Sequence, residues 1–427
     1  MLLTAIALAL MPSVTEPEMN RPLVDRVVIQ GNARTRDRVI RNELQTEPGM
    51  PFDDQLWAED VQRIRDLDLF WQTEATAATV PDGVELYLTV AEKWTLIPSF
   101  GFTRTPDTLE WYTGLYEANF LGLNMELGFQ FHRRRGGNTY TLWHYNERVD
   151  DTPVYYELEG HLLSSQHVLY DQEADPLQYY QASGRLVHTE VGMRLDDRGY
   201  HRLGFIYRPS DIDYALWEDT AEQQRLHEST GARPPEPQFL QQVGLRLRLN
   251  ELRQTDYIFS GQMLSALYLT TPRFLESSLY FTQVSAEYRY LFTPLPRHNA
   301  GFRVFTGLSY GADVVNVFRM GGLHEVRGFP DERFRGENIW FANTEYRYPA
   351  IDSTYLLAQV VGFVDGGRTW NGRYLSTDAF REMALSGGIG VRFLVKPLVA
   401  TRLRIDYGRA VSPYRTGALS IGVQQFF

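Results

Sequence analysis

The chain of 427 residues is 43% hydrophobic and carries a formal net charge of −11, which disfavours nucleic acid as a partner because phosphate recognition needs basic surface. It contains no cysteine, so disulfides, thiolate nucleophiles and cysteine-ligated metals are excluded. No apolar run after residue 11 approaches the roughly 18 residues that a membrane helix requires, and any membrane-spanning part must therefore consist of strands closed into a barrel.

Residues 1–20 open with an apolar run from Met1 to Leu10 and continue as polar, proline-containing sequence. This order is typical of a secretory signal peptide, although the positively charged start of such a signal is missing. Two interpretations stay open, a signal peptide or a short N-terminal core segment. The pattern does not indicate where a signal would be cleaved.

Residues 21–93 have the pattern of a small α/β unit. A first strand is followed by a helix that Thr35 would cap. A second helix is predicted to begin near Asp53, because its apolar residues recur at helical spacing and a carboxylate suits the positive end of a helix. Two alternating strands, over 71–79 and 84–90, would complete a sheet that covers the helices.

From Thr95 onward the helical period gives way to a period of two residues, which is typical of the strands of a transmembrane barrel. Residues 243–250 show it most clearly, with apolar and polar side chains in alternation. A soluble sandwich would alternate in the same way, so the connections must decide. Short connections alternate with long ones, including 165–179, 209–237 and 365–383, as they do in outer-membrane barrels.

The alternating segments amount to sixteen strands, an even number as expected for a bacterial single-chain barrel. We therefore predict an α+β unit over residues 21–93, followed by an all-β, 16-stranded antiparallel transmembrane barrel over 94–427. The predicted strands span residues 95–104, 109–118, 124–132, 138–147, 153–164, 180–193, 200–208, 238–250, 257–271, 278–292, 299–309, 338–348, 356–364, 384–394, 400–408 and 418–427.

The long predicted connection at 310–337 contains one short motif, formed by Val326, Arg327, Gly328 and Phe329. Two carboxylates follow it on the polar face of the next strands, at Glu345 and Asp365. A single cation in an irregular loop, followed by inward carboxylates, predicts a loop that folds back into the barrel and is held there by an ion pair. The alternative is that these residues are ordinary lumen charges that balance one another.

The last predicted strand, 418–427, ends in an aromatic residue. This strand resembles the C-terminal signal by which outer-membrane barrels are recognised, and the spacing of Ser420, Gly422 and Phe427 carries the resemblance. Gln425 stands where such signals usually have an apolar residue. The first and last strands must pair to close the barrel. A weak seam between them would expose backbone donors and acceptors to another strand.

In these features the chain resembles the BamA/TamA-type outer-membrane assembly and translocation superfamily. The β-α-α-β-β order of residues 21–93, with its segments IQGNARTRDRVI and DGVELYLTVAEKW, resembles a POTRA domain. The tetrad at 326–329 is followed in order by NTEYRYP, GFVDGG, GGIGVRF and LRIDYG, and this succession resembles the barrel of the superfamily.

The resemblance implies that Arg327 is the loop-tip cation in the lumen, with Asp365 as its main ion-pair partner and Glu345 as the second. It also implies a bacterial outer-membrane protein whose POTRA domain lies in the periplasm. The expected partners are unfolded outer-membrane or secreted polypeptides, outer-membrane lipids, and periplasmic accessory proteins or chaperones. The POTRA domain would offer client polypeptides the edge formed by Gln72, Glu74, Thr76 and Ala78.

Insertion or translocation of proteins at the outer membrane is therefore the leading functional hypothesis. The alternatives are a two-partner-secretion exporter, which usually has two POTRA domains, and a passive, structural or lipid-handling barrel. An enzyme is disfavoured, because the strand histidines lack metal-ligand spacing and no nucleophile elbow or Walker loop occurs. Glu157 and Glu159 share one face, but a solvated lumen wall explains them more simply. No catalytic residue, metal or cofactor is expected.

Overall fold

The computed structural model describes residues 21–423, apart from gaps at 105–108, 135–136, 151, 171–175, 197–198, 256, 331, 373–381 and 397–401. The predicted signal segment at 1–20 and the terminal Phe427 lie outside the described residues. The chain forms two compact units, Met1–Glu92 and Lys93–Phe427. No helix in the described part of the chain is both long and apolar enough to cross a membrane.

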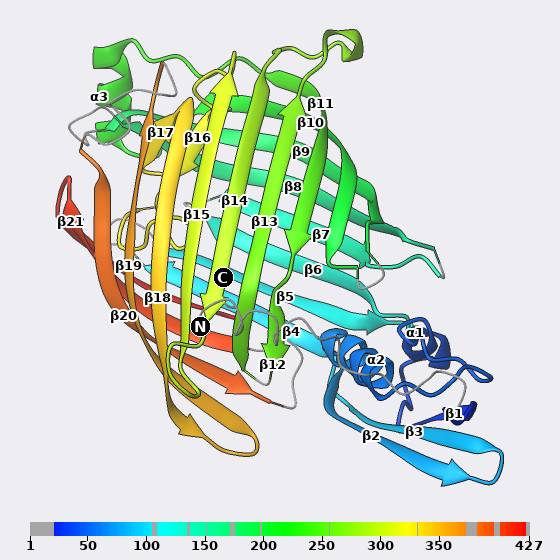
Figure 1. Ribbon diagram of the computed structural model, residues 1–427. Helices are drawn as coiled ribbons and strands as arrows, with labels where there is room; N and C mark the ends of the chain where they lie inside the picture. The colour runs from blue at the N-terminus through cyan, green and yellow to red at the C-terminus, as the bar shows by residue number, and fades with distance from the viewer. Residues whose placement is uncertain are drawn as a thin grey trace, which may run out of the picture. The chain divides into compact units, whose positions relative to one another are not determined.

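The N-terminal unit is a three-stranded sheet accompanied by two helices. Its central strand runs parallel to one neighbour and antiparallel to the other, in the order β1-β3-β2, so that β2 lies at an edge. Figure 1 shows α1 and α2 beside this sheet. The elements are β1 (Val24–Gln30), α1 (Asp37–Arg41), α2 (Asp54–Asp66), β2 (Phe70–Val80) and β3 (Gly83–Glu92).

Helix α2 begins and packs as its sequence predicts. The side chain of Asp53 caps it by accepting hydrogen bonds from the backbone N–H groups of Gln55 (2.8 Å) and Leu56 (3.2 Å). Arg21 donates a hydrogen bond of 2.6 Å to the same carboxylate, and this bond lowers the pKa of Asp53. The apolar face of α2 joins the core of the unit against β3. That core includes Trp57, Val61, Ile64, Leu86 and Leu88.

The first helix is shorter than expected, and the prediction that Thr35 caps it is wrong. Helix α1 starts only at Asp37, and Arg36 at its N-cap position makes no side-chain cap bond. The backbone N–H of Thr35 instead donates to the carboxylate of Glu92 at the end of β3 (2.6 Å). This bond joins residue 35 to the sheet, one residue before the N-cap position of α1.

The second unit is a closed antiparallel barrel of sixteen long strands, drawn from cyan to red in Figure 1, and this confirms the predicted architecture. Each strand pairs with its neighbour along the chain, and β22 pairs with β4 to close the ring. The strands are β4 (Leu96–Arg104), β5 (Leu109–Phe120), β6 (Met125–Arg134), β7 (Gly137–Asn146), β8 (Val154–Tyr170), β9 (Pro176–Arg194), β10 (His201–Leu216), β11 (Gln238–Asn250), β13 (Ile258–Thr270), β14 (Thr282–Phe292), β15 (Asn299–Tyr310), β18 (Asn338–Asp352), β19 (Leu356–Trp370), β20 (Ala384–Val395), β21 (Arg402–Ser412) and β22 (Thr416–Val423).

The two-residue period has the physical cause expected for a barrel in a membrane. On β11, Leu245 and Leu249 are exposed on the outer surface, whereas Arg246 and Arg248 between them form ion pairs in the interior. Successive side chains of a strand point to opposite faces, so the apolar set faces lipid and the polar set faces the bore.

Several predicted long connections are partly strand, which corrects the sequence-based boundaries. β8 continues to Tyr170, β10 to Leu216 and β19 to Trp370, each beyond its predicted end. Backbone pairing continues there although outward positions are no longer regularly apolar, as at Asp211 and Asp213 on β10, because a ladder needs only backbone partners. The segment 209–237 also contains α3 (Ala221–Thr230), whose N-terminus has a capping box formed by Thr220 and Gln223.

Candidate functional site

The connection between β15 and β18 folds back into the barrel. It forms a short hairpin, β16 (Phe318–Met320) with β17 (Phe334–Gly336), and the tetrad lies between these two strands of the hairpin. Val326 and Phe329 are both fully buried. They belong to one apolar cluster with Met320, Ile339, Phe341, Ala384 and Ala410, which joins the loop to the inner wall.

Arg327 lies between two carboxylates of the wall. Its Nε and one terminal nitrogen donate to the two oxygens of Asp365 on β19, at 2.6 and 2.8 Å, and its backbone N–H donates to the same group at 3.1 Å. Its other terminal nitrogen donates to Glu345 on β18 at 3.0 Å. The guanidinium also stacks over the ring of Phe363, 3.5 Å from the ring centroid. Only 2% of Arg327 is exposed, so these contacts replace its water shell.

The two carboxylates belong to a larger charged network that the sequence did not reveal as a set. Glu345 also accepts from Arg347 (3.0 Å) and Arg392 (3.2 Å), and Arg392 donates to Asp406 at 2.6 Å. All of these residues are buried. Arg392 and Asp406 lie on the polar faces of the segments GGIGVRF and LRIDYG. This position on the polar face is the feature of the sequence that could have identified them. Opposite charges on four neighbouring strands thus compensate one another and the loop cation.

Gly328 and Gly408 allow the loop backbone to touch strand β21. Gly328 has φ +92°, and a Cβ there would meet Gly408 and Arg409 backbone atoms at 3.0–3.1 Å. A Cβ on Gly408 would meet the backbone nitrogen of Gly328 at 2.8 Å. A side chain at either position would separate the loop from the wall.

The loop is also held at the opposite wall of the barrel. Glu332 accepts hydrogen bonds from Arg319 (2.9 Å) and Arg335 (3.0 Å) within the hairpin, and it contacts Nδ1 of His167 on β8 at 2.8 Å. Strands β8 and β19 are separated by seven long strands in either direction around the ring. The loop therefore crosses the bore from the wall that holds Arg327 to the wall that holds His167.

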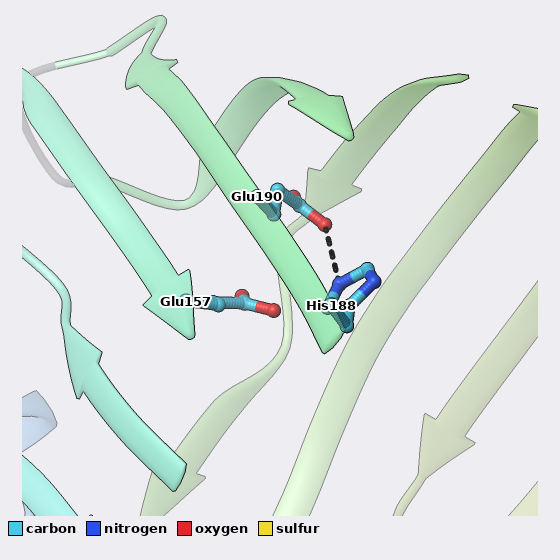
Figure 2. A group of neighbouring side chains, drawn as sticks. All are labelled: Glu157, His188 and Glu190. Carbon is cyan, nitrogen blue, oxygen red and sulfur yellow. Dashed lines mark ion pairs between the residues drawn. The ribbon is translucent and has the colours of Figure 1, made fainter. Parts of the chain in front are cut away.

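A second charged cluster lies on the inner wall between β8 and β11. Figure 2 shows Glu157 on β8 pointing toward His188 and Glu190 on β9, and their possible ligand atoms lie within 4.8 Å of one another. The sequence did not reveal this group, because it joins neighbouring strands rather than residues at one ligand spacing. Arg248 pairs with Glu157 at 2.7 Å, and Arg246 pairs with Glu190 at 2.7 Å. Since these guanidinium groups already neutralise both carboxylates, the cluster is suited to an internal ion-pair network rather than to a cation.

The other two predicted sites are the edge strand of the N-terminal sheet and the closure of the barrel. Gln72, Glu74, Thr76 and Ala78 lie on β2, and all four are exposed. At the barrel closure, Leu419–Gly422 pair with Gly101–Arg104, so Ser420 is opposite Thr103 and Gly422 opposite Gly101. These four pairs join the described parts of β22 and β4, compared with ten between β13 and β14.

These features define a class: a membrane barrel whose long loop is fastened inside its own bore, preceded by a small α/β unit of the POTRA type. Residues 119–424 match the model of the Omp85 superfamily domain, and residues 22–93 match the POTRA model, described as a surface antigen variable number repeat. The chain belongs to the Omp85 superfamily.

Solved structures show the same fold at low sequence identity. BamA from Haemophilus ducreyi lacking POTRA domains 1–3 is 14% identical, with a TM-score of 0.58 over 95% of this chain and 85% of that chain. CdiB from Escherichia coli is 12% identical, with a TM-score of 0.62 over 94% of this chain and 76% of that chain. No protein with a curated functional description matches the chain.

The family assignment fixes the broad setting of the protein. It implies the bacterial outer membrane, with the POTRA domain in the periplasm. It supports insertion of outer-membrane proteins or translocation of polypeptides, with unfolded polypeptides as clients. Barrels of this family are not enzymes.

Proposed function

We propose that this protein inserts polypeptides into the outer membrane or moves them across it, and that the loop held by Arg327 keeps the barrel in its working form. The observation that carries the proposal is the burial of Arg327 between Asp365 and Glu345, three residues from three separate parts of the chain. A simple pore does not require a cationic side chain from a loop, because adjacent charges of the wall can neutralise one another.

We further propose that client strands first pair with the edge of β2. This strand has β3 on one side only, and its outer residues are mostly small. Unpaired backbone N–H and C=O groups at a sheet edge accept an added strand with little demand on its sequence. Ala75, Ala77 and Ala78 leave that approach open.

In the barrel, the junction of β22 with β4 is the proposed place of client pairing. It joins the two strands that are most distant along the chain, so it can separate without breaking a hairpin. The small number of pairs in its described part supports this role. A client strand that added there would replace backbone hydrogen bonds instead of leaving them unmade.

Photocrosslinking tests the periplasmic step. A photoreactive residue at Thr76, on the β2 edge, should capture unfolded outer-membrane polypeptides in cells. The matched control is Thr89, which is exposed on the central strand β3 and lies between two paired neighbours. Equal capture from both positions would contradict pairing at the edge.

Depletion distinguishes insertion from secretion. If the protein inserts barrels, its loss should reduce a set of outer-membrane proteins while secreted polypeptides persist. If it exports, the secreted set should fall instead. Unchanged levels of both sets would exclude both activities and favour a passive or structural barrel.

A further inference from the structure

A pocket of about 700 Å³ lies at the periplasmic end of the barrel wall, and none of its lining residues belongs to the Arg327 site. The first barrel strand follows the POTRA domain, so antiparallel alternation places the β9–β10 and β11–β13 turns at that end. The pocket is lined by Asp196, Tyr200, His201, Asn250, Glu251, Arg253, Ser260, Gly261, Gln262 and Tyr290.

The pocket opens on the outer, lipid-facing surface. Gln262 and Tyr290 are paired across β13 and β14, and both are exposed. They point outward like Leu264 and Tyr288, which lie two residues further from the periplasm on the same strands and are exposed in the apolar belt. Polar lining directly beneath an apolar belt places the pocket at the depth of lipid head groups.

The lining carries both signs of charge and is held in place by its own hydrogen bonds. Gln262 donates to Glu251 (2.7 Å), and Asp196 accepts from the backbone N–H of His201 (2.7 Å). The backbone N–H of Asn250 donates to Nδ1 of His201 at 3.3 Å, so the proton of the neutral ring is on Nε2. The pocket thus offers two carboxylates beside two donors, Arg253 and the His201 ring.

Its shape depends on a glycine in β13. Gly261 has φ +108°, and a Cβ there would meet the backbone oxygen of Glu251 at 2.2 Å. The short strand β12 (Arg253–Thr255) pairs with β13 just beyond this point. Close approach of the two backbones sets the carboxylate of Glu251 and the guanidinium of Arg253 on one rim.

We propose that this pocket binds the phosphoethanolamine head group of a phospholipid in the periplasmic leaflet. Asp196 and Glu251 would hold the ammonium group, with the tyrosine rings supplying further cation attraction, and Arg253 and His201 would hold the phosphate. An anionic head group would meet two carboxylates without an ammonium to satisfy them. Choline would bring an ammonium that cannot donate hydrogen bonds.

Native mass spectrometry of the full-length protein tests the proposal with three added phospholipids that share acyl chains and differ in head group: ethanolamine, choline and glycerol. We expect the wild type to retain the ethanolamine lipid at least fivefold better than the other two. Glu251→Gln should abolish this preference, and Arg253→Gln should weaken retention of the ethanolamine lipid severalfold.

The matched control is Glu147→Gln, which changes an exposed carboxylate in another periplasmic turn and should leave lipid retention unchanged. Heat-modifiable migration on gels verifies that each variant is folded, and a variant that fails is replaced by Asp196→Asn. Equal retention of all three lipids, or wild-type retention in folded pocket variants, would overturn the proposal. Soluble glycerophosphoethanolamine that binds as tightly as the lipid would overturn the membrane source of the ligand.

Discussion

The bore contains two charged clusters of similar composition and different construction. Around Arg327, the cation comes from a loop, and its partners come from β18 and β19. Around Glu190, every participant belongs to the wall itself, on β8, β9 and β11. The first cluster therefore joins a loop to the barrel wall, whereas the second joins strands that backbone ladders already hold together. Similar ion pairs thus have different consequences when they are lost.

The comparison is tested most strongly by Arg327→Ala against Arg248→Ala. Removing one partner of a buried ion pair costs about 3–5 kcal/mol, because the remaining charges stay desolvated. For Arg327 this free energy is lost from the attachment of the loop to the wall. Client assembly or secretion should therefore decrease about tenfold or more in a barrel that still folds. Arg248→Ala should retain activity. Heat-modifiable migration and a client assay in cells measure both properties, and wild-type activity in Arg327→Ala would count against the loop assignment.

Gly408→Ala should have a smaller effect of the same kind. The added methyl group would meet the backbone of Gly328 and Arg327 at 2.8–3.0 Å, and such overpacking costs about 1–3 kcal/mol. We expect a severalfold decrease in client assembly, together with faster proteolysis within the loop. Gly362→Ala serves as the control, because a Cβ there meets nothing within 4 Å. Equal activity of the two variants would show that backbone contact with β21 is dispensable.

Glu190→Gln should affect stability more than activity. The carboxylate accepts a hydrogen bond from Tyr155 (2.7 Å) and pairs with Arg246, so its loss should cost about 1–3 kcal/mol of unfolding free energy. Client assembly should remain near wild type. Chelators and added zinc should change neither property, since the arginines occupy the carboxylates. A zinc-dependent rise in melting temperature that disappears in Glu190→Gln would instead identify a metal site.

The smallest effect is expected outside the bore, at Asp53. The hydrogen bond from Arg21 lowers the pKa of Asp53, so its ionised form is favoured in the folded state. That stabilisation is present above the ordinary aspartate pKa, about 3.9, and is lost as pH falls through the lowered value. Asp53→Ala should speed hydrogen exchange in α2 by the loss of about 1 kcal/mol of capping at pH 7. The difference from wild type should shrink as the pH falls through the lowered pKa of Asp53.

The sequence predicted the structure well where the surroundings of the side chains alternate regularly along the chain. Lipid on one face and water on the other impose the alternation seen at Leu245 and Arg246, and this pattern was sufficient to predict sixteen strands. The extensions of β8, β10 and β19 were missed because the outward face there is no longer regularly apolar, as at Asp211 and Asp213. The Thr35 cap was wrong because the helix begins later, with Arg36 at its N-cap position, and the contact of Thr35 with Glu92, 57 residues away, leaves no local pattern in the sequence.

The candidate site shows the same limit. Arg327, Glu345 and Asp365 could be named together because an ordered set of motifs surrounds them. Glu332 and His167 are 165 residues apart, and only the closure of the ring brings them together. Pairing between residues so distant leaves no local pattern, and its partners become visible only when the barrel geometry is known.

The attachment of the loop to both walls sets different energetic costs for two routes through the protein. A polypeptide threaded down the axis would collide with the β16–β17 hairpin and would have to break the Glu332–His167 contact, the Arg327 pairs, or both. A strand that enters sideways between β4 and β22 would disturb neither. In this conformation the molecule therefore obstructs axial passage while leaving lateral entry unhindered by the hairpin.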